Sequence, residues 1–171
     1  MYIADLHIHS RYSRATSREC TPEYLDMWAR RKGIDLLGTG DFTHPAWRSE
    51  LEEKLTPAEE GLYQLKEELQ LKDYILGKTS PRFVISGEIS SIYKKNGRVR
   101  KVHNVILLPG LADAKRLSEK LETIGNIHSD GRPILGLDSR DLLEITLEIC
   151  PRAIFVPAHI WTPHFSMFGA F

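Results

Sequence analysis

The sequence predicts an α/β domain with mostly parallel strands, and two observations lead to this fold class. Short apolar segments typical of buried strands alternate along the chain with longer segments whose apolar residues recur at helical spacing. The 171 residues, of which 42% are hydrophobic, are also enough to form one globular domain with a substantial core. In such folds ligands gather at the carboxyl ends of the strands. The residues at the strand ends are therefore the first candidates for a functional site.

The first strand is expected at residues 3–10, IADLHIHS. Because the side-chain period of a strand is two, Asp5, His7 and His9 are expected on one face of an otherwise apolar segment. A strand with this pattern can offer ligands to a metal ion. The motif is also compatible with hydrogen-bonded histidines near a strand end, so its context has to decide between the two interpretations.

Capping and turn signals indicate the remaining elements. Thr21 can cap a helix that stops at Gly33. Thr56 and Glu59 form a capping box in front of leucines at helical spacing, which predicts a helix over residues 56–71. In chain order, we expect helices at 22–33, 45–55, 56–71, 111–125 and 139–151, and strands at 34–40, 82–90, 102–108 and 153–159.

A hairpin is expected to join the strand at 82–90, the third along the chain, to the strand at 102–108, the fourth. Residues 96–97, Asn-Gly, are a strong two-residue hairpin signal, so the fourth strand should return antiparallel to the third. If residues 95 and 98 pair across the turn, Glu88 and His103 lie diagonally on one face, about 7–8 Å apart at the backbone. Both side chains can then reach one ion, unless a one-residue bulge changes the register.

The strand ends and the hairpin together bring six candidate metal ligands to one edge of the sheet: His7, His9, Asp41, Glu88, His103 and His159. Imidazoles mixed with carboxylates suit zinc, manganese or iron, and a carboxylate such as Glu88 can bridge two ions. Two divalent ions about 3.5–4 Å apart are the usual arrangement for phosphate-ester hydrolysis. The sequence contains no glycine-rich phosphate loop or nucleophile-elbow serine that would favour other chemistry. Hydrolysis of a phosphoester is therefore the favoured reaction.

Charge and cysteine content narrow the class of protein. The 23 lysines and arginines balance 23 acidic residues, so net charge gives no general attraction to an anionic partner. Five of the eight residues at 94–101, KKNGRVRK, are basic, and this cluster is either solvated surface or a phosphate-binding face.

No apolar run reaches the ~20 residues of a membrane span. The isolated Cys20 and Cys150 suggest a reducing compartment. We expect a cytoplasmic protein that does not enter membranes, and no protein partner can be inferred.

Five motifs together resemble the polymerase-and-histidinol-phosphatase (PHP) domain family, and the resemblance covers nearly the whole chain. The motifs are DLHIHS, a T-x-D segment after the second strand, SGEIS, KVHNVILL and VPAHIW. The resemblance implies that residues 1–171 form a PHP-type metal-dependent phosphoesterase domain. It also implies a distorted (β/α)7 barrel with up to three metal ions.

The resemblance implies roles for most of the candidate ligands. His7 and His9 are similar to the ligands of the first motif, and Glu88 is similar to the bridging carboxylate of the catalytic centre. His103 and His159 are similar to ligands of a second ion. The implied cofactors are two or three divalent ions of zinc, manganese or iron, with magnesium or manganese able to support activity.

The second strand departs from the family pattern. The usual family sequence there is T-D-H, whereas this chain has Thr39-Gly40-Asp41. Either Asp41 takes the place of the histidine as a metal ligand, or the third ion is lost.

Within the family, the chain is most similar to the N-terminal PHP domain of the endonuclease Q group, DNA-repair nucleases that cut on the 5′ side of deaminated bases such as uracil and hypoxanthine. The similarity lies in the region after GTGDFTHPAW and in PAHIWTPHFSMFG. It implies that DNA containing deaminated bases is the partner. Phe165 and Phe168 are candidates for stacking on bases, and the other residues expected to contact DNA are Lys94, Lys95, Arg98, Arg100, Trp161 and His164. Each of these also has a plain interpretation, as a core aromatic or as solvated charge.

One family motif is absent. The family closes its site with a late D-x-H motif, and nothing after His159 supplies it. We therefore expect a partial barrel, truncated before the last strands, and weak or no nicking by these 171 residues alone. Two other functions stay open. One is a small-molecule phosphoesterase of the histidinol phosphatase type, and the other is a catalytically inactive structural or interaction module.

Overall fold

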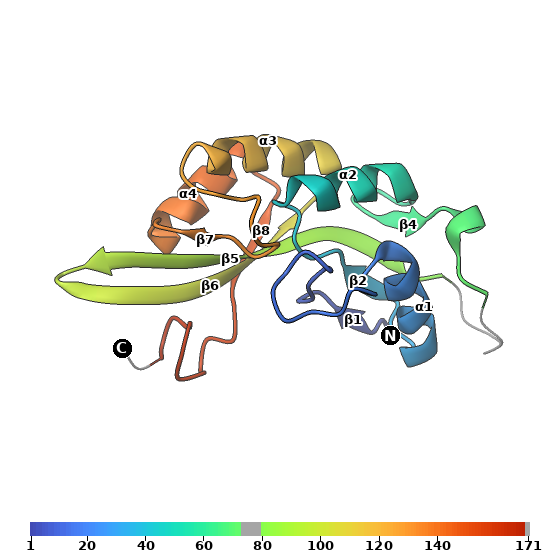
Figure 1. Ribbon diagram of the computed structural model, residues 1–171, viewed down its shortest axis with the longest axis horizontal. Helices are drawn as coiled ribbons and strands as arrows, with labels where there is room; N and C mark the ends of the chain where they lie inside the picture. Colours follow the sequence, from blue (N-terminus) through green and yellow to red (C-terminus); the bar gives the residue numbers. More distant parts are fainter. Residues whose placement is uncertain (73–79, 170–171) are drawn as a thin grey trace.

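The computed structural model describes residues 1–72 and 80–169 and shows a curled, mixed sheet covered by helices on its outer face (Figure 1). Within this part of the chain, eight strands form the sheet in the order β1-β2-β5-β4-β3, and β6, β7 and β8 extend it from β5. The α-helices of the same part are α1 (Pro22–Lys32), α2 (Pro45–Lys54), α3 (Leu111–Glu122) and α4 (Ser139–Ile149). The predicted α/β class and partial barrel are confirmed, as are these helices.

Two short strands begin the sheet, β1 (Ala4–Asp5) and β2 (Leu36–Gly38), parallel to each other and to the start of β5 (Arg82–Lys95). β1 ends earlier than predicted, so both histidines of the H-x-H motif lie beyond it. The segment that follows β1 passes very close to β2, and glycines in β2 and just after it make room for this approach. A Cβ on Gly38 would lie 2.6 Å from the Leu6 carbonyl oxygen, and a Cβ on Gly40 would lie 2.5 Å from that of Ile8.

The long hairpin of β5 and β6 (Arg98–Leu108) has the predicted register. Asn96 and Gly97 both have positive φ, 52° and 73°, as a two-residue type I′ turn requires. Residues 95 and 98 pair across this turn, and Ser90 pairs with His103 without a bulge. The hairpin prediction is therefore confirmed.

Strand pairing is more mixed than predicted. β6 runs antiparallel both to β5 and to β8 (Ile154–Pro157), so β8 again runs in the direction of β5. β1, β2, β5 and β8 therefore run in the same direction, and their carboxyl ends face the same edge of the sheet. A further short strand that was not predicted, β7 (Ile134–Leu135), pairs in parallel with β5.

The helix predicted over residues 56–71 is wrong. The chain instead forms an antiparallel hairpin of β3 (Leu55–Pro57) and β4 (Tyr63–Leu65), followed by a 3-10 turn, η1 (Glu67–Leu69). Gly61, with φ of 77°, interrupts a helix here. Pairing also buries Leu55 and Leu65 together against α2, which outweighs the local capping signal.

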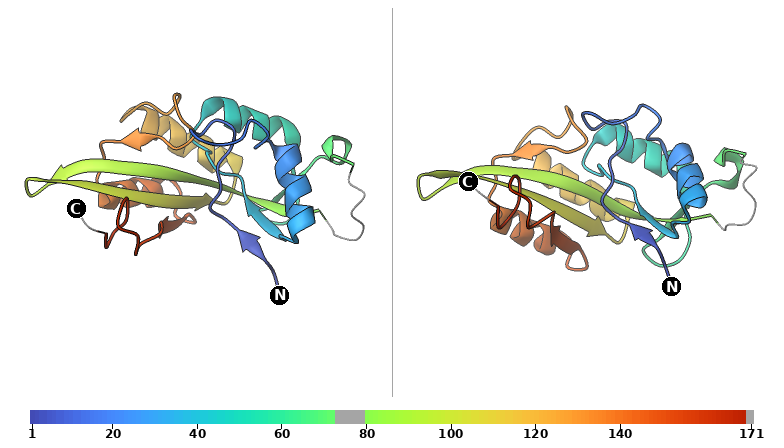
Figure 2. Two further views of the ribbon diagram at one scale, coloured as in Figure 1. Left: turned by 60° about the horizontal axis from the view of Figure 1, so that its bottom comes forward. Right: turned by 90° about the horizontal axis from the view of Figure 1, so that it is seen from below.

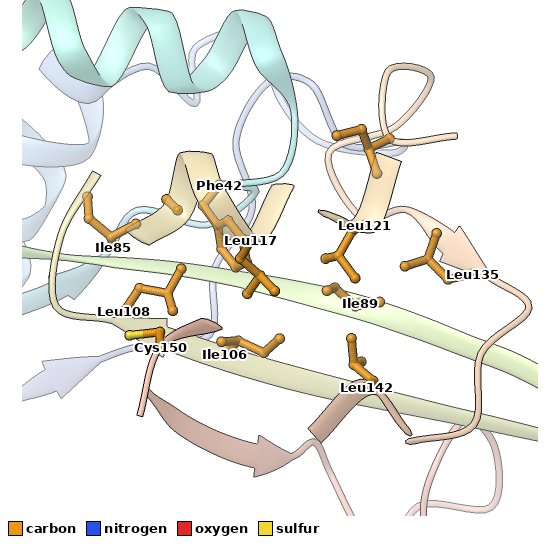
Figure 3. Packing of buried hydrophobic residues seen from close by; sticks show 12 residues of the cluster. Phe42, Ile85, Ile89, Ile106, Leu108, Leu117, Leu121, Leu135, Leu142 and Cys150 are labelled. Atoms are coloured by element: carbon orange, nitrogen blue, oxygen red, sulfur yellow. The ribbon is translucent and has the colours of Figure 1, made fainter. Parts of the chain in front are cut away.

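The main core lies between the β5–β6 hairpin and two helices, α3 and α4 (Figure 3). Residues of α3 and α4 pack onto alternate residues of the two strands, and the labelled members include Ile85, Ile89, Ile106, Leu108, Leu117, Leu121 and Leu142. A second cluster joins α2 to β2 and the start of β5 through Trp47, Leu51, Leu37 and Phe83. The residues between these core positions on β5 face the opposite side of the sheet, where the candidate site lies.

β1 and β8 lie at two edges of the described sheet (Figure 2), and the segments that follow them meet on its inner face, where Leu6 packs against the cluster that contains Ala158. Phe155 of β8 packs toward the main core, whereas its neighbours Ile154 and Val156 are 58% and 44% exposed. In the described residues, none of the helices combines the length and apolar character that a membrane crossing needs.

Candidate metal centre

Glu88, near the middle of β5, is the centre of the site, with a side chain that is 1% exposed. Its Oε1 lies 3.1 Å from Nε2 of His7 and 3.0 Å from Nδ1 of His103. The same oxygen lies 3.6 Å from Nε2 of His159. The second carboxylate oxygen, Oε2, lies 3.3 Å from Nε2 of His9. Four histidines therefore surround one buried carboxylate.

The four histidines reach Glu88 from three parts of the fold. His7 and His9 follow β1, in the segment that passes the glycines of β2 and its end. His103 lies on β6, across the hairpin from the residue two positions after Glu88. His159 follows β8 and has a positive φ of 32°, an uncommon conformation for a residue with a side chain.

The ligand atoms fall into two groups that share Glu88. In the first group, His7, His9 and Glu88 each offer an atom within 4.8 Å of the others, and His103 and His159 form the second group with Glu88. Oε1 of Glu88 is buried and makes no hydrogen bond within the described structure, although three ring nitrogens lie near it. Ring nitrogens that converge on an oxygen without hydrogen-bond geometry are suited to ligating a cation between them. The donor set therefore fits a divalent metal ion, and Glu88 belongs to both groups.

Asp41 lies directly behind this site, fully buried. Its Oδ1 lies 3.0 Å from Nδ1 of His9. Its Oδ2 accepts hydrogen bonds from the Ser10 amide and hydroxyl at 2.7 and 2.6 Å, and from the Ser13 hydroxyl at 2.9 Å. Asp41 belongs to neither ligand group of the described chain, and its oxygens are engaged in these contacts, so its expected ligand role stays a prediction. A proton held on His9 Nδ1 leaves Nε2 as the atom that faces Glu88.

Asp5 was expected to share a face with the two histidines. It ends β1 as an exposed residue, and neither ligand group of the described chain includes it. The strand period that predicted its position does not continue past β1.

The charges in the site are strongly coupled. The hydrogen bond to Asp41, followed by the contact with Glu88, raises the pKa of His9 to about 9 in spite of burial. Burial raises the pKa of Glu88, but contacts with His103, His7 and His9 outweigh it and hold that pKa well below its usual range. Glu88 is thus ionised at neutral pH, the form that binds a cation.

Two solved structures resemble this chain. The lesion-specific endonuclease PfuEndoQ from Pyrococcus furiosus matches with a TM-score of 0.78 and 30% sequence identity over 98% of this chain. The fold is similar to part of endonuclease Q. An endonuclease Q complex with a 27-mer duplex substrate, which carries an abasic lesion at the active site, matches with a TM-score of 0.74 and 30% identity over 94% of this chain. These matches cover 37% and 35% of the two solved chains.

Two curated proteins are related in sequence. The uncharacterized protein MJ0043 of Methanocaldococcus jannaschii is 31% identical over 160 residues, and the uncharacterized protein YqxK of Bacillus subtilis is 29% identical over 180 residues. The alignments cover 93% and 97% of this chain, which spans 16% and 42% of the length of these relatives. No family model matches the sequence.

Sequence reasoning did not identify Arg132, whose Nη1 lies 3.2 Å from Oε2 of Glu88. Arg132 follows Gly131, which approaches the site so closely that a Cβ there would lie 2.2 Å from Oδ2 of Asp41. The available signal was the Asp-Gly-Arg sequence at 130–132, and such a sequence predicts only a turn.

The structure separates the basic residues of the hairpin onto two faces. Lys94 shares the face of Glu88, because the two positions are an even number of residues apart in β5. Lys95, Arg98 and Arg100 lie on the opposite face by the same count and the observed register. Lys95 pairs with Asp138 at 2.7 Å, and Arg100 lines a cleft beside α4.

The aromatic residues after β8 differ in exposure. Trp161 is 80% exposed and lies with its ring centroid 5.0 Å from that of Phe168. His164 is exposed, and its carbonyl accepts a hydrogen bond from Thr162. Phe165 is partly buried against His103, with ring centroids 4.5 Å apart.

Proposed function

We propose that this chain is the metal-binding part of a PHP-type phosphodiester hydrolase that nicks DNA on the 5′ side of deaminated bases such as uracil and hypoxanthine. The observation that carries the proposal is the buried Glu88 carboxylate shared by two groups of histidines. The similarity in sequence and fold to a lesion-specific endonuclease supports the same chemistry.

The donor set favours zinc, manganese or iron, and magnesium or manganese is expected to support turnover. Divalent ions held by these residues would supply a hydroxide nucleophile at neutral pH and would stabilise charge on the phosphate. Glu88 would contribute the carboxylate that both groups share, and the two groups, His7 with His9 and His103 with His159, would contribute nitrogen ligands. Asp41 orients His9 through Nδ1, and such supporting hydrogen bonds are typically worth about 10–100-fold in metal affinity or activity.

DNA is the proposed partner. The solved endonuclease Q complex contains a duplex with an abasic lesion, which supports DNA as the class of substrate for this chain. The basic hairpin face with Lys94 and the exposed aromatics after β8, Trp161 and Phe168, are the surfaces we assign to phosphate contacts and base stacking.

A nicking assay tests the proposal. Labelled duplexes with one deoxyuridine or one deoxyinosine, and a matched undamaged duplex, are incubated with the chain and Mn²⁺ or Mg²⁺. We expect weak or no nicking by this chain, metal-dependent nicking on the 5′ side of the lesion by a longer form of the protein that carries a D-x-H motif, and no nicking by His9→Ala in that longer form. Arg152→Gln, which changes an exposed arginine paired with Glu60, is the control and should nick normally.

Two other results would redirect the assignment. Hydrolysis of histidinol phosphate, without nicking of either lesion duplex by the longer form, would favour a small-molecule phosphoesterase. Failure of the purified chain to bind any transition metal would favour an inactive structural or interaction module.

A further inference from the structure

A cleft of about 280 Å³ opens next to the metal centre, on the same face of the hairpin. His103 lines the cleft and also belongs to the second ligand group, and Ser90, its partner across the hairpin, lines the cleft beside it. A cleft of this size is at the lower end for ligand sites and suits one nucleotide or a similar small group, and not a whole duplex. Its position makes it a candidate for the part of a substrate next to the reacting phosphate.

Two arginines flank the cleft and are held by one carboxylate. Arg14 and Arg132 are far apart in the sequence, but Asp130 joins them. Asp130 Oδ1 accepts hydrogen bonds from the amide of Arg132 at 3.0 Å and from that of Arg14 at 3.4 Å, and Oδ2 lies 3.4 Å from Nε of Arg14. Asp130 thereby ties the loop after β1 to the loop before β7, and both loops contribute an arginine to the lining of the cleft.

Both guanidinium groups can donate to a ligand. Arg132 uses Nη1 for Glu88, and the described structure records no further acceptor for its side chain. The side chain of Arg14 is 82% exposed. A guanidinium offers five donors and recognises phosphate in a bidentate way, so two of them in one cleft favour a phosphorylated ligand.

Phe165 provides an apolar wall. Its carbonyl accepts the hydrogen bond of the His103 amide at 3.0 Å, and its backbone has a positive φ of 54°, which is uncommon for a bulky residue. The Lys101 ammonium lies 5.7 Å from the centre of its ring. A strained aromatic residue fixed between the metal centre and a basic side chain suits contact with a nucleotide base or sugar.

We propose that this cleft binds the nucleotide next to the cleaved phosphate, with Arg14 and Arg132 contacting its phosphate and Phe165 its base or sugar. The inference rests on the proposed function, because it assigns a subsite for that substrate. Phosphate contacts of this kind fix the register of the strand, so the arginines act as positioning residues for the reaction at the metal centre.

Binding measured in EDTA tests the cleft separately from metal chemistry. The affinity of a fluorescent duplex with one abasic site is measured by anisotropy at several salt concentrations, for the wild type, Arg14→Gln, Arg132→Gln and the double variant. Each substitution should lower the slope of log affinity against log salt by about 1 and reduce affinity about tenfold at low salt. Arg152→Gln removes the same charge away from the cleft and should leave both values unchanged. Thermal melts confirm folding, and Arg132→Lys, which keeps the charge, should retain most of the slope.

Competition identifies the class of ligand. Thymidine 5′-monophosphate should displace the duplex better than inorganic phosphate, and Phe165→Leu should remove that difference. A folded double variant with the slope of the wild type would overturn the proposal, and equal competition by phosphate and thymidine 5′-monophosphate would overturn the role of Phe165. Slopes that change as expected, in a protein whose longer form with a D-x-H motif binds Mn²⁺ but never nicks, would contradict the proposed function and leave the cleft assignment in place.

Discussion

At the level of single residues, the site depends on very close packing behind the ligands. The backbone of Gly131 lies so near Asp41 that a methyl group in place of its side-chain hydrogen would collide with the carboxylate. Asp41 in turn orients His9, so Gly131 influences a ligand that it does not touch. No sequence motif indicates such a role, because the requirement arises only when residues 90 positions apart meet in the fold.

Gly131→Ala tests this packing. A Cβ 2.2 Å from Asp41 Oδ2 must displace the carboxylate, and overpacking of this kind typically costs about 1–3 kcal/mol. We expect a lower melting temperature and weaker Mn²⁺ binding, measured by calorimetry. Gly136→Ala is the matched control, since no atom lies within 4 Å of its Cβ position. Equal behaviour of the two variants would show that the close approach has no consequence.

Asp41→Asn separates an orienting role from a ligand role. The amide keeps the size of the side chain but loses the charge that holds His9 Nδ1 and the serine donors. We expect affinity at the His7–His9 group to fall about 10–100-fold, while the group with His103 and His159 keeps its ion. A two-site metal titration measures this, and loss of both ions would contradict the role assigned to Asp41.

At the level of elements, prediction from the sequence succeeded where one short motif determines the local backbone geometry. The Asn-Gly turn determined the register of β5 and β6, and this register was enough to place Glu88 beside His103. The helix predicted at 56–71 failed because burial of Leu55 and Leu65 depends on contacts with α2 that the local pattern does not contain. The positions of Arg132 and Asp130 could not be predicted for the same reason, since they depend on how two loops meet.

The two faces of the hairpin predict different effects for adjacent lysines. Lys94 lies on the face of the metal centre, whereas Lys95 lies on the other face and pairs with Asp138. Lys94→Gln should therefore lower the slope of log DNA affinity against log salt concentration by about 1, and Lys95→Gln should leave this slope unchanged. Anisotropy titrations at several salt concentrations measure both slopes. Equal slopes for the two variants would mean that this face does not meet the DNA.

At the level of the whole molecule, the metal centre joins segments from both ends of the chain. His7 and His9 come from the segment after β1, and His159 comes from the segment after β8, at the two edges of the curled sheet. A ligand that binds only when these segments are in place stabilises the folded state. Metal binding should therefore be linked to stability of the entire fold.

Thermal melts with and without metal measure this linkage. At a free Mn²⁺ concentration of about 100 times Kd, one site adds about 2.7 kcal/mol, which corresponds to about 5–10 °C for a chain of this size. EDTA should reverse the shift, and Glu88→Gln should abolish it. A melting temperature of the wild type that does not respond to metal would contradict linkage through this site.

Metal content per chain tests most directly whether Glu88 bridges two ions. Elemental analysis after loading with Mn²⁺ and removal of free metal should give close to two ions for the wild type. His9→Ala and His159→Ala should each retain one ion, because each removes a ligand from a different group. Glu88→Gln, which removes the shared carboxylate, should retain none. A wild type without bound metal, or a Glu88→Gln variant with the metal content of the wild type, would contradict the bridged site.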